Sequence, residues 1–176
     1  MKLKQNGFTL VELLMTLSIA VILMATVTPG LISLLRDNQM TALHNDLMSD
    51  LAITRSTAVT RGNNATLCPS NISGNQCLKK AQIWSYGWLV FDDLDNDGTI
   101  DTNETILATK NKLSSRLKMI GNTDRITFDP EGSAYGFSAQ FAFCDSRGEE
   151  GKRGMIVSNS GRSRVAEPYE INVRCP

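Results

Sequence analysis

Histidine is almost absent from this 176-residue chain, in which His44 is the only one. A single histidine excludes most histidine-rich metal sites and disfavours catalysis by a serine–histidine or cysteine–histidine pair. The chain also lacks the Gly-x-Ser-x-Gly motif of hydrolases and the phosphate-binding loop of P-loop proteins. The sequence therefore predicts a protein that is not an enzyme and that needs no cofactor, with calcium as the one ligand to consider.

Net charge is also lacking, because 18 lysines and arginines balance 18 aspartates and glutamates. Whole-chain charge therefore gives no reason to expect a polyanionic partner. Apolar residues make up 41% of the chain and charged residues 20%, which is typical of a globular protein and excludes a disordered one. The mean hydropathy of −0.14 excludes a protein with several membrane spans but leaves room for one.

The apolar residues gather near the amino terminus, where residues 8–28 contain one charged side chain, Glu12. A helix of this length is about 31 Å long, which matches the hydrocarbon core of a bilayer. Lys2 and Lys4 precede the run without any acidic residue, and this favours a cytoplasmic amino terminus. The sequence thus predicts one transmembrane helix, with the rest of the chain across the membrane.

A secretory signal peptide is the alternative interpretation of this run. Its charged start and apolar core fit, but the run is long and has no convincing small-x-small cleavage site. Glu12 fits poorly as well, because an ionised carboxylate in hydrocarbon is costly unless it has a partner. We therefore expect Glu12 to be functional, the plainer alternative being a side chain that reaches back to the membrane surface.

The stretch Gly-Phe-Thr-Leu-Val-Glu at residues 7–12 follows a short basic leader. It resembles the class III signal of type IV pilins and type II secretion pseudopilins. The resemblance implies that a prepilin peptidase removes residues 1–7 by cleaving between Gly7 and Phe8, and then methylates the Phe8 amine. It also implies that Glu12 pairs with the charged amine of a neighbouring pilin in the fibre, since opposite charges attract strongly at low dielectric.

The helix is expected to continue beyond the hydrophobic segment of residues 8–29. Pro29, at a position where this family often has a proline, is expected to bend it. Over residues 30–62 the pattern predicts an amphipathic helix that packs against a head domain. Its recurring apolar positions are Leu31, Leu35, Leu43, Leu47, Leu51 and Ala58. His44 is expected to be a surface or partly packed residue and not a metal ligand.

Residues 63–176 contain short apolar segments separated by turn residues, which predicts a β-rich globular head. The expected strands are 65–68, 82–91, 105–108, 117–120, 125–128, 136–144, 155–158, 164–166 and 170–174. The predicted fold class is α+β. A long amino-terminal helix, whose hydrophobic half protrudes, packs against an antiparallel sheet or a pair of sheets.

All four cysteines lie in this head, and four cysteines allow three pairings. We favour the local pair Cys68–Cys77, together with Cys144–Cys175. The expected topology puts the head in an oxidising compartment, which favours disulfides, and zinc would need closer Cys-x-x-Cys pairs. A disulfide to Cys175 would hold a tail that is otherwise prone to fray.

The head resembles the GspH/FimT group of minor pilins and pseudopilins, which includes FimU-like proteins. The resemblance is carried by the tryptophan strand and acidic turn from Gly87 to Gly98 and by the sequence Ser-Gly-Arg-Ser-Arg-Val at residues 160–165. It implies a minor pilin of a type IV pilus. Such a protein is held in the inner membrane with a periplasmic head, and joins other pilins in an extracellular fibre. The alternative is a GspH-like minor pseudopilin of a type II secretion system.

Residues 93–104 fit the pattern of a twelve-residue calcium loop, with glycine at position 6. Acids occupy positions 1, 3, 5, 9 and 12, namely Asp93, Asp95, Asp97, Asp101 and Glu104. Oxygen ligands at alternate positions can converge on one hard cation, which predicts a calcium site. The flanks are expected to be strands, so the loop is not an EF-hand. The alternative is an acidic turn without a cation.

The carboxyl-terminal part has the opposite charge, with 11 basic and 8 acidic residues over 110–176. Arg162 and Arg164 share one face of an extended strand, about 6.6 Å apart. Arginines bind phosphates through paired hydrogen bonds, and Gly161 allows a close backbone approach.

This Gly-Arg-x-Arg pattern resembles the motif by which FimT-type pilins bind DNA during natural transformation, so double-stranded DNA is a candidate partner. Lys152 and Arg153 would extend the basic patch. The alternative is that the arginines face solvent or pair with Glu167 and Glu170.

Overall fold

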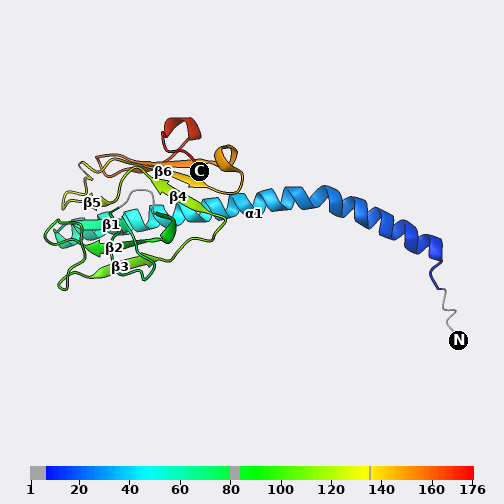
Figure 1. The fold of residues 1–176 in the computed structure, drawn as a ribbon, viewed down its shortest axis with the longest axis horizontal. Helices are drawn as coiled ribbons and strands as arrows, with labels where there is room; N and C mark the ends of the chain where they lie inside the picture. The colour runs from blue at the N-terminus through cyan, green and yellow to red at the C-terminus, as the bar shows by residue number, and fades with distance from the viewer. Residues whose placement is uncertain (1–6, 80–83, 135) are drawn as a thin grey trace. The chain divides into compact units, whose positions relative to one another are not determined.

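The computed structural model describes residues 7–79, 84–134 and 136–176, and these form one long helix and two small antiparallel sheets (Figure 1). The helix α1 spans Leu10–Arg61. The strands are β1 Ala65–Pro69, β2 Trp88–Asp92, β3 Ile106–Lys110, β4 Lys118–Gly121, β5 Ile126–Phe128, β6 Ala139–Cys144, β7 Arg153–Val157 and β8 Ser163–Ala166. Three short 3-10 helices lie at Trp84–Tyr86, Gly148–Gly151 and Pro168–Glu170.

Local signals account for both ends of α1. The hydroxyl of Thr9 accepts the backbone N–H of Glu12 at 3.3 Å, which caps one of the free donors of the first turn. Gly62 ends the helix with a φ of 69°, and its N–H donates to the carbonyl of Ala58. The helix is continuous through residue 29 and agrees with the expected range to within two residues at each end.

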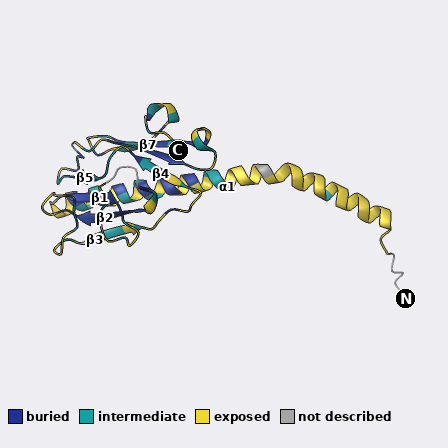
Figure 2. Ribbon diagram, viewed as in Figure 1, coloured by how far each residue is buried: buried dark blue, intermediate teal, exposed yellow. Residues whose placement is uncertain are grey.

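The chain divides into two compact units, residues 1–39 and residues 40–176. In the first unit the helix from residue 10 to residue 35 is exposed at every described position except one half-buried residue (Figure 2). Leu31 and Leu35 are each 54% exposed, whereas Met40 is fully buried. The expectation that packing follows the amphipathic pattern from Leu31 onward is therefore wrong, because Met40 is the first buried residue among the described residues of the helix.

The strands form one sheet of order β3-β2-β1-β5 and another of order β4-β6-β7-β8, with antiparallel pairing throughout. The carboxyl half of α1 runs between the two sheets (Figure 1). The sequence predicted eight of these strands in order. It was wrong about residues 170–174, since Pro168–Glu170 forms a 3-10 helix and the chain beyond it has no regular structure. Pro168 supplies no N–H for a strand ladder.

The expected strand over residues 82–91 is shorter than predicted, because β2 begins at Trp88. A 3-10 helix occupies Trp84–Tyr86, and residues 82 and 83 lie outside the described part of the chain. Gly87 has a φ of 100°, a conformation that favours glycine, and this turn separates the two elements.

One hydrophobic core joins α1 to both sheets. Met40, Leu43, Leu47, Leu51 and Ala58 of the helix are buried. They pack in one cluster with side chains of β1 and β2 on one side and of β6 and β7 on the other. Burying such side chains contributes roughly 1.5–3 kcal/mol each before the cost of chain ordering. The α+β class predicted from the sequence is confirmed.

His44 lies inside this core and is only 7% exposed, so the expectation of a surface or partly packed residue is wrong. Its ring meets that of Phe143 edge-on at a centroid distance of 5.4 Å. Burial lowers the pKa of His44 below its ordinary value of 6.5, and the charge of Arg153 lowers it further. The imidazole is therefore neutral at pH 7 and acts as a packing residue.

Polar contacts hold α1 on the first sheet. The indole N–H of Trp88 donates to Asp50 at 2.6 Å, and Lys110 lies 2.5 Å from Asp46. Arg61 forms an ion pair with Asp92 at the end of β2. Burial raises the pKa of Asp50 above its ordinary value, while the bond from Trp88 opposes that change. These contacts link helix positions to β2 and β3 and fix the rotation of α1 in the head.

Both predicted disulfides, Cys68–Cys77 and Cys144–Cys175, are confirmed. The second joins β6 to the carboxyl-terminal tail, which also donates from the Cys175 N–H to Glu149 at 2.6 Å. Ile171 packs with Ala142 and Ala166 in a separate small cluster. Since side chains alternate along β6, this cluster lies on the face opposite the helix. The tail therefore covers the outer face of the second sheet.

Removal of the two disulfides should affect stability unequally. Cys144 and Cys175 are 31 residues apart, whereas Cys68 and Cys77 are 9 apart. Loop-closure entropy grows with loop length. Replacing Cys144 and Cys175 by serine should therefore lower the free energy of unfolding by about 1 kcal/mol more than replacing Cys68 and Cys77 by serine. Urea unfolding of the full chain in nonionic detergent, followed by tryptophan fluorescence, measures this. An equal or reversed ranking would contradict the prediction.

Candidate functional site

The amino-terminal signal lies outside the regular helix. Gly7, Phe8 and Thr9 have no regular secondary structure, and α1 begins directly after them. Phe8 is 84% exposed, and Glu12 is exposed in the first turn of the helix. The bond between Gly7 and Phe8 is thus accessible to a peptidase, while Glu12 is already on the helix that the resemblance assigns to fibre packing.

The helix α1 is the one element in the described part of the chain that is long and apolar enough to cross a membrane. Its most apolar window has a mean hydropathy of 2.3, and none of that window is buried within the molecule. These side chains therefore form no part of the core. They require a non-aqueous environment that the described head does not supply.

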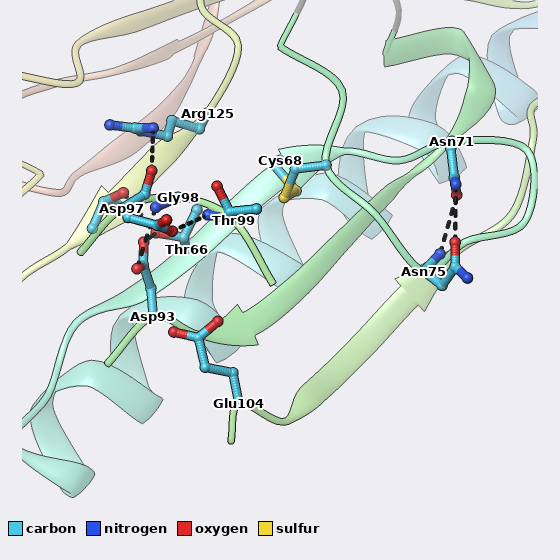
Figure 3. The surroundings of a disulfide bond; sticks show 12 residues. Thr66, Cys68, Asn71, Asn75, Asp93, Asp97, Gly98, Thr99, Glu104 and Arg125 are labelled. Carbon is cyan, nitrogen blue, oxygen red and sulfur yellow. Dashed lines mark hydrogen bonds between the residues drawn. A yellow bond between two sulfur atoms is a disulfide. The ribbon is translucent and has the colours of Figure 1, made fainter. Parts of the chain in front are cut away.

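The acidic loop brings three of the five predicted calcium ligands together. Asp93, Asp95 and Asp97 each place a carboxylate oxygen within 4.8 Å of the others. Asp93 is fully buried and accepts the hydroxyl of Thr66 at 2.6 Å and the N–H of Gly98 at 3.3 Å (Figure 3). Gly98 has a φ of 71°, so the glycine at position 6 serves the turn as predicted.

Glu104 closes the loop through its own hydrogen bonds. Its carboxylate accepts the N–H of Leu94 at 2.8 Å and that of Asp101 at 2.9 Å. Burial raises the pKa of Glu104 above its ordinary value, and the charges of Asp93 and Asp95 add to this against the two hydrogen bonds. The predicted twelfth ligand is therefore committed to backbone donors, and the calcium site remains a prediction.

The turn between β7 and β8 fixes the predicted DNA-binding hairpin. The N–H of Ser158 donates to the carbonyl of Arg162 at 2.9 Å, and that of Gly161 donates to Ser158 at 2.8 Å. Gly161 has a φ of 75°, and a Cβ there would lie 2.3 Å from the carbonyl oxygen of Gly132. Glycine is thus required for both the turn and its packing. Arg162 is exposed next to it.

Arg164 is paired with an acid on the adjoining 3-10 helix. Its guanidinium donates to the two carboxylate oxygens of Glu170 at 3.1 and 2.8 Å. The hydrogen bond from Arg164 lowers the pKa of Glu170, and the N–H of Glu167 adds to this effect. For Arg164, the alternative predicted from the sequence, an ion pair with Glu170, is therefore the one that the structure shows.

Lys152 and Arg153 do not extend the patch as predicted. Lys152 is 8% exposed, and its ammonium lies 2.8 Å from Glu149 and also donates to the carbonyl of Val173. Arg153 donates to the hydroxyl of Thr41 on α1 at 2.8 Å. Both side chains hold the fold together, so the expected basic surface is reduced to the arginines of the hairpin.

Two known protein-family models match this chain. The model of the family described as type II transport protein GspH matches residues 44–161, which is more than half of the chain. The chain belongs to the GspH family. A model of the prokaryotic N-terminal methylation motif matches residues 2–28, which include Gly7, Phe8 and Glu12. The resemblance noted in the sequence to pilin-like proteins of the GspH/FimT group is thereby confirmed.

Solved structures share the fold of this GspH-family member. The type IV minor pilin FimU of Pseudomonas aeruginosa is 20% identical with a TM-score of 0.60, over 80% of this chain and 98% of that one. The minor pseudopilin EpsH from the type 2 secretion system of Vibrio cholerae is 7% identical with a TM-score of 0.50, over 74% and 98%. A comparison with curated protein sequences finds no match.

The calcium hypothesis predicts a measurable change on adding the ion. Calcium should raise the melting temperature and give a heat of binding with a Kd of about 10⁻⁴–10⁻³ M, the range of extracellular sites. Asp95→Asn should weaken this binding, because Asp95 is an exposed member of the cluster. Glu131→Gln, an exposed acid elsewhere in the head, serves as the control. Absence of both heat and stabilisation at millimolar calcium would rule the hypothesis out.

Proposed function

We propose that this GspH-family protein is a minor pilin that takes part in the assembly of a type IV pilus. The observation that carries the proposal is the exposed apolar half of α1, which begins two residues after the expected cleavage site. A segment this apolar must lie in lipid or against other apolar helices. The membrane provides the lipid before assembly, and a fibre of packed pilin helices provides the apolar neighbours after it.

In this proposal, Glu12 provides the charge that pairs with a neighbouring subunit during assembly. A carboxylate inside hydrocarbon is costly alone, and the amine of a cleaved Phe8 on a neighbouring pilin is a matching charge. Prepilin peptidase would create that amine by removing residues 1–7. The exposure of Phe8 and Glu12 is consistent with both events.

The proposed location follows from the same helix. Before assembly the protein would sit in the inner membrane with its head in the periplasm, since basic residues precede the span and two disulfides stabilise the head. After assembly it would lie in an extracellular fibre with other pilins. Its role would be structural and not enzymatic.

The alternative is a minor pseudopilin of a type II secretion system, an assignment favoured by the description of the matching family. Leader cleavage and helix packing would be the same there. The fold is more similar to that of FimU than to that of EpsH, which favours the pilus. Fractionation of sheared cells separates the alternatives, because a surface pilus is recovered as long extracellular fibres.

We further propose that the head binds double-stranded DNA at the β7–β8 turn, as part of natural transformation. The supporting observation is that Arg162 is exposed at this turn and that, within the described residues, no hydrogen bond or ion pair involves its side chain. A free guanidinium beside a glycine can bind phosphate oxygens through two hydrogen bonds. Arg164 would join only when phosphate displaces Glu170.

Substitution of Glu12 tests the assembly proposal. Glu12→Ala should leave cleavage after Gly7 intact but reduce the protein in sheared fibres at least about tenfold, because breaking a buried charge pair costs about 3–5 kcal/mol. Immunoblots of fibres and mass spectrometry of the mature amino terminus measure the two steps. Glu131→Gln in the head is the control. Normal incorporation of the Glu12 variant, or a native chain beginning well beyond Thr28, would contradict the proposal.

Substitution of Glu170 tests whether Arg164 is masked. Glu170→Gln should raise DNA affinity severalfold and make its salt dependence steeper by about one ion, because the guanidinium becomes available to phosphate. Glu167→Gln changes net charge equally without removing the partner of Arg164, and it should have the smaller effect. Anisotropy of a labelled duplex at several salt concentrations measures both variants. Equal effects would mean that only net charge matters.

A further inference from the structure

A hollow of about 240 Å³ lies between α1 and the β7–β8 turn, within the unit of residues 40–176. Leu51 and Arg55 line it from the helix, and Arg162 and Ser163 line it from the turn and the start of β8. The sequence predicts that Arg162 acts with Arg164, its near neighbour in the chain, and these two arginines do line another hollow together. The fold also gives Arg162 a second arginine neighbour, Arg55, from a helix position more than one hundred residues earlier.

Neither arginine of the hollow has a hydrogen-bond or ion-pair partner within the described residues, in contrast to two other arginines of the head. Arg61 is paired with Asp92 and Arg164 with Glu170. For Arg55 and Arg162, by contrast, the described residues provide no hydrogen-bond acceptor and no carboxylate. Two unpaired cations beside one hollow repel each other, and an anion placed between them would satisfy both. A negatively charged group in the hollow would thus have two cationic side chains to bind.

Two glycine turns fix the position of this pair. A Cβ at Gly132 would lie 3.0 Å from the Nε atom of Arg55, so the guanidinium of Arg55 rests closely over that turn. A Cβ at Gly161, next to Arg162, would lie 2.3 Å from the carbonyl oxygen of Gly132. The turn at Gly132 thus lies against both the side chain of Arg55 and the turn that carries Arg162, and such placement reduces the ordering cost of binding.

We propose that Arg55 and Arg162 form one phosphate-binding notch and that Arg55 is a DNA-contacting residue of this protein. This inference rests on the proposed DNA binding, and it assigns the phosphate contact to Arg55 and Arg162 in place of Arg162 and Arg164. The notch takes a backbone phosphate of double-stranded DNA, which the two guanidinium groups bind from the helix side and the turn side. Arg164 does not line this hollow, and its guanidinium is paired with Glu170.

A double-mutant cycle on the full chain in nonionic detergent tests the notch. Arg55→Gln and Arg162→Gln should each weaken binding of a labelled duplex severalfold and lower the salt dependence by about one ion. Their combined effect should be less than the product of the two, because both residues contact the same phosphate. Arg116→Gln, which removes an exposed arginine before β4, is the control and should have a smaller effect than either. Arg55→Lys should keep the salt dependence while losing part of the affinity.

The possible results separate the inference from the function on which it rests. If the unsubstituted chain binds no DNA, the proposed DNA binding fails and the notch fails with it. If the chain binds DNA but only Arg162→Gln weakens the binding, and Arg55→Gln does not, then the proposed notch is wrong while the proposed DNA binding stands. Multiplicative effects of the two substitutions would also overturn it. If Arg55→Gln leaves DNA binding intact but removes the protein from fibres, the hollow holds an acidic segment of a neighbouring pilin instead. Circular dichroism melts verify that each variant folds.

Discussion

The burial of one face of α1 between two antiparallel sheets positions every other feature of the head. Met40, Leu47 and Leu51 provide the buried stripe, and the core extends from them into both sheets. Asp46, Asp50 and Arg61 on the same helix then connect it to β2 and β3. Because so many contacts converge on one helix, the acidic loop after β2 and the β7–β8 turn are held at fixed positions relative to it.

The same helix has a second apolar region that the head does not use. From residue 10 to residue 35 every described side chain except one is exposed, although the segment is apolar enough to cross a membrane. A soluble protein would leave no such region uncovered. The helix therefore carries two apolar surfaces, one that makes the head fold and one that other molecules must cover. This division is the physical basis for assigning an assembly role to a chain of the GspH family.

Much of the fold could be predicted from the sequence because it depends on local signals. The membrane-length run, the glycine after the helix and the close pair Cys68–Cys77 each act within a short stretch of chain. The last expected strand failed because Glu170 was read as a strand residue when it caps a 3-10 helix behind Pro168. The start of packing at Met40 was also missed, since periodicity shows that a face is apolar but not how far the head extends along it.

The candidate site was harder to predict because its partners are distant in the chain. Lys152 looked like part of a basic patch, yet Glu149 and the carboxyl-terminal tail enclose it. Arg55 gave no signal at all, since a single arginine on an amphipathic helix is ordinary. The acidic loop was the exception, because its ligand spacing is local, and three of its carboxylates do converge.

The helix α1 begins close to the proposed cleavage site, so its amino-terminal end acts differently on the Glu12 carboxylate and on the proposed Phe8 amine. The first turn of any helix carries a partial positive charge from its free N–H groups. That field favours the carboxylate of Glu12 where it stands but repels a charged amine two residues before Leu10. If the proposed cleavage takes place, the new amine is poorly accommodated on its own helix, and a carboxylate on an adjacent helix is the better counter-ion. The polarity of α1 therefore supports the proposed pairing of charges between subunits over pairing within one subunit.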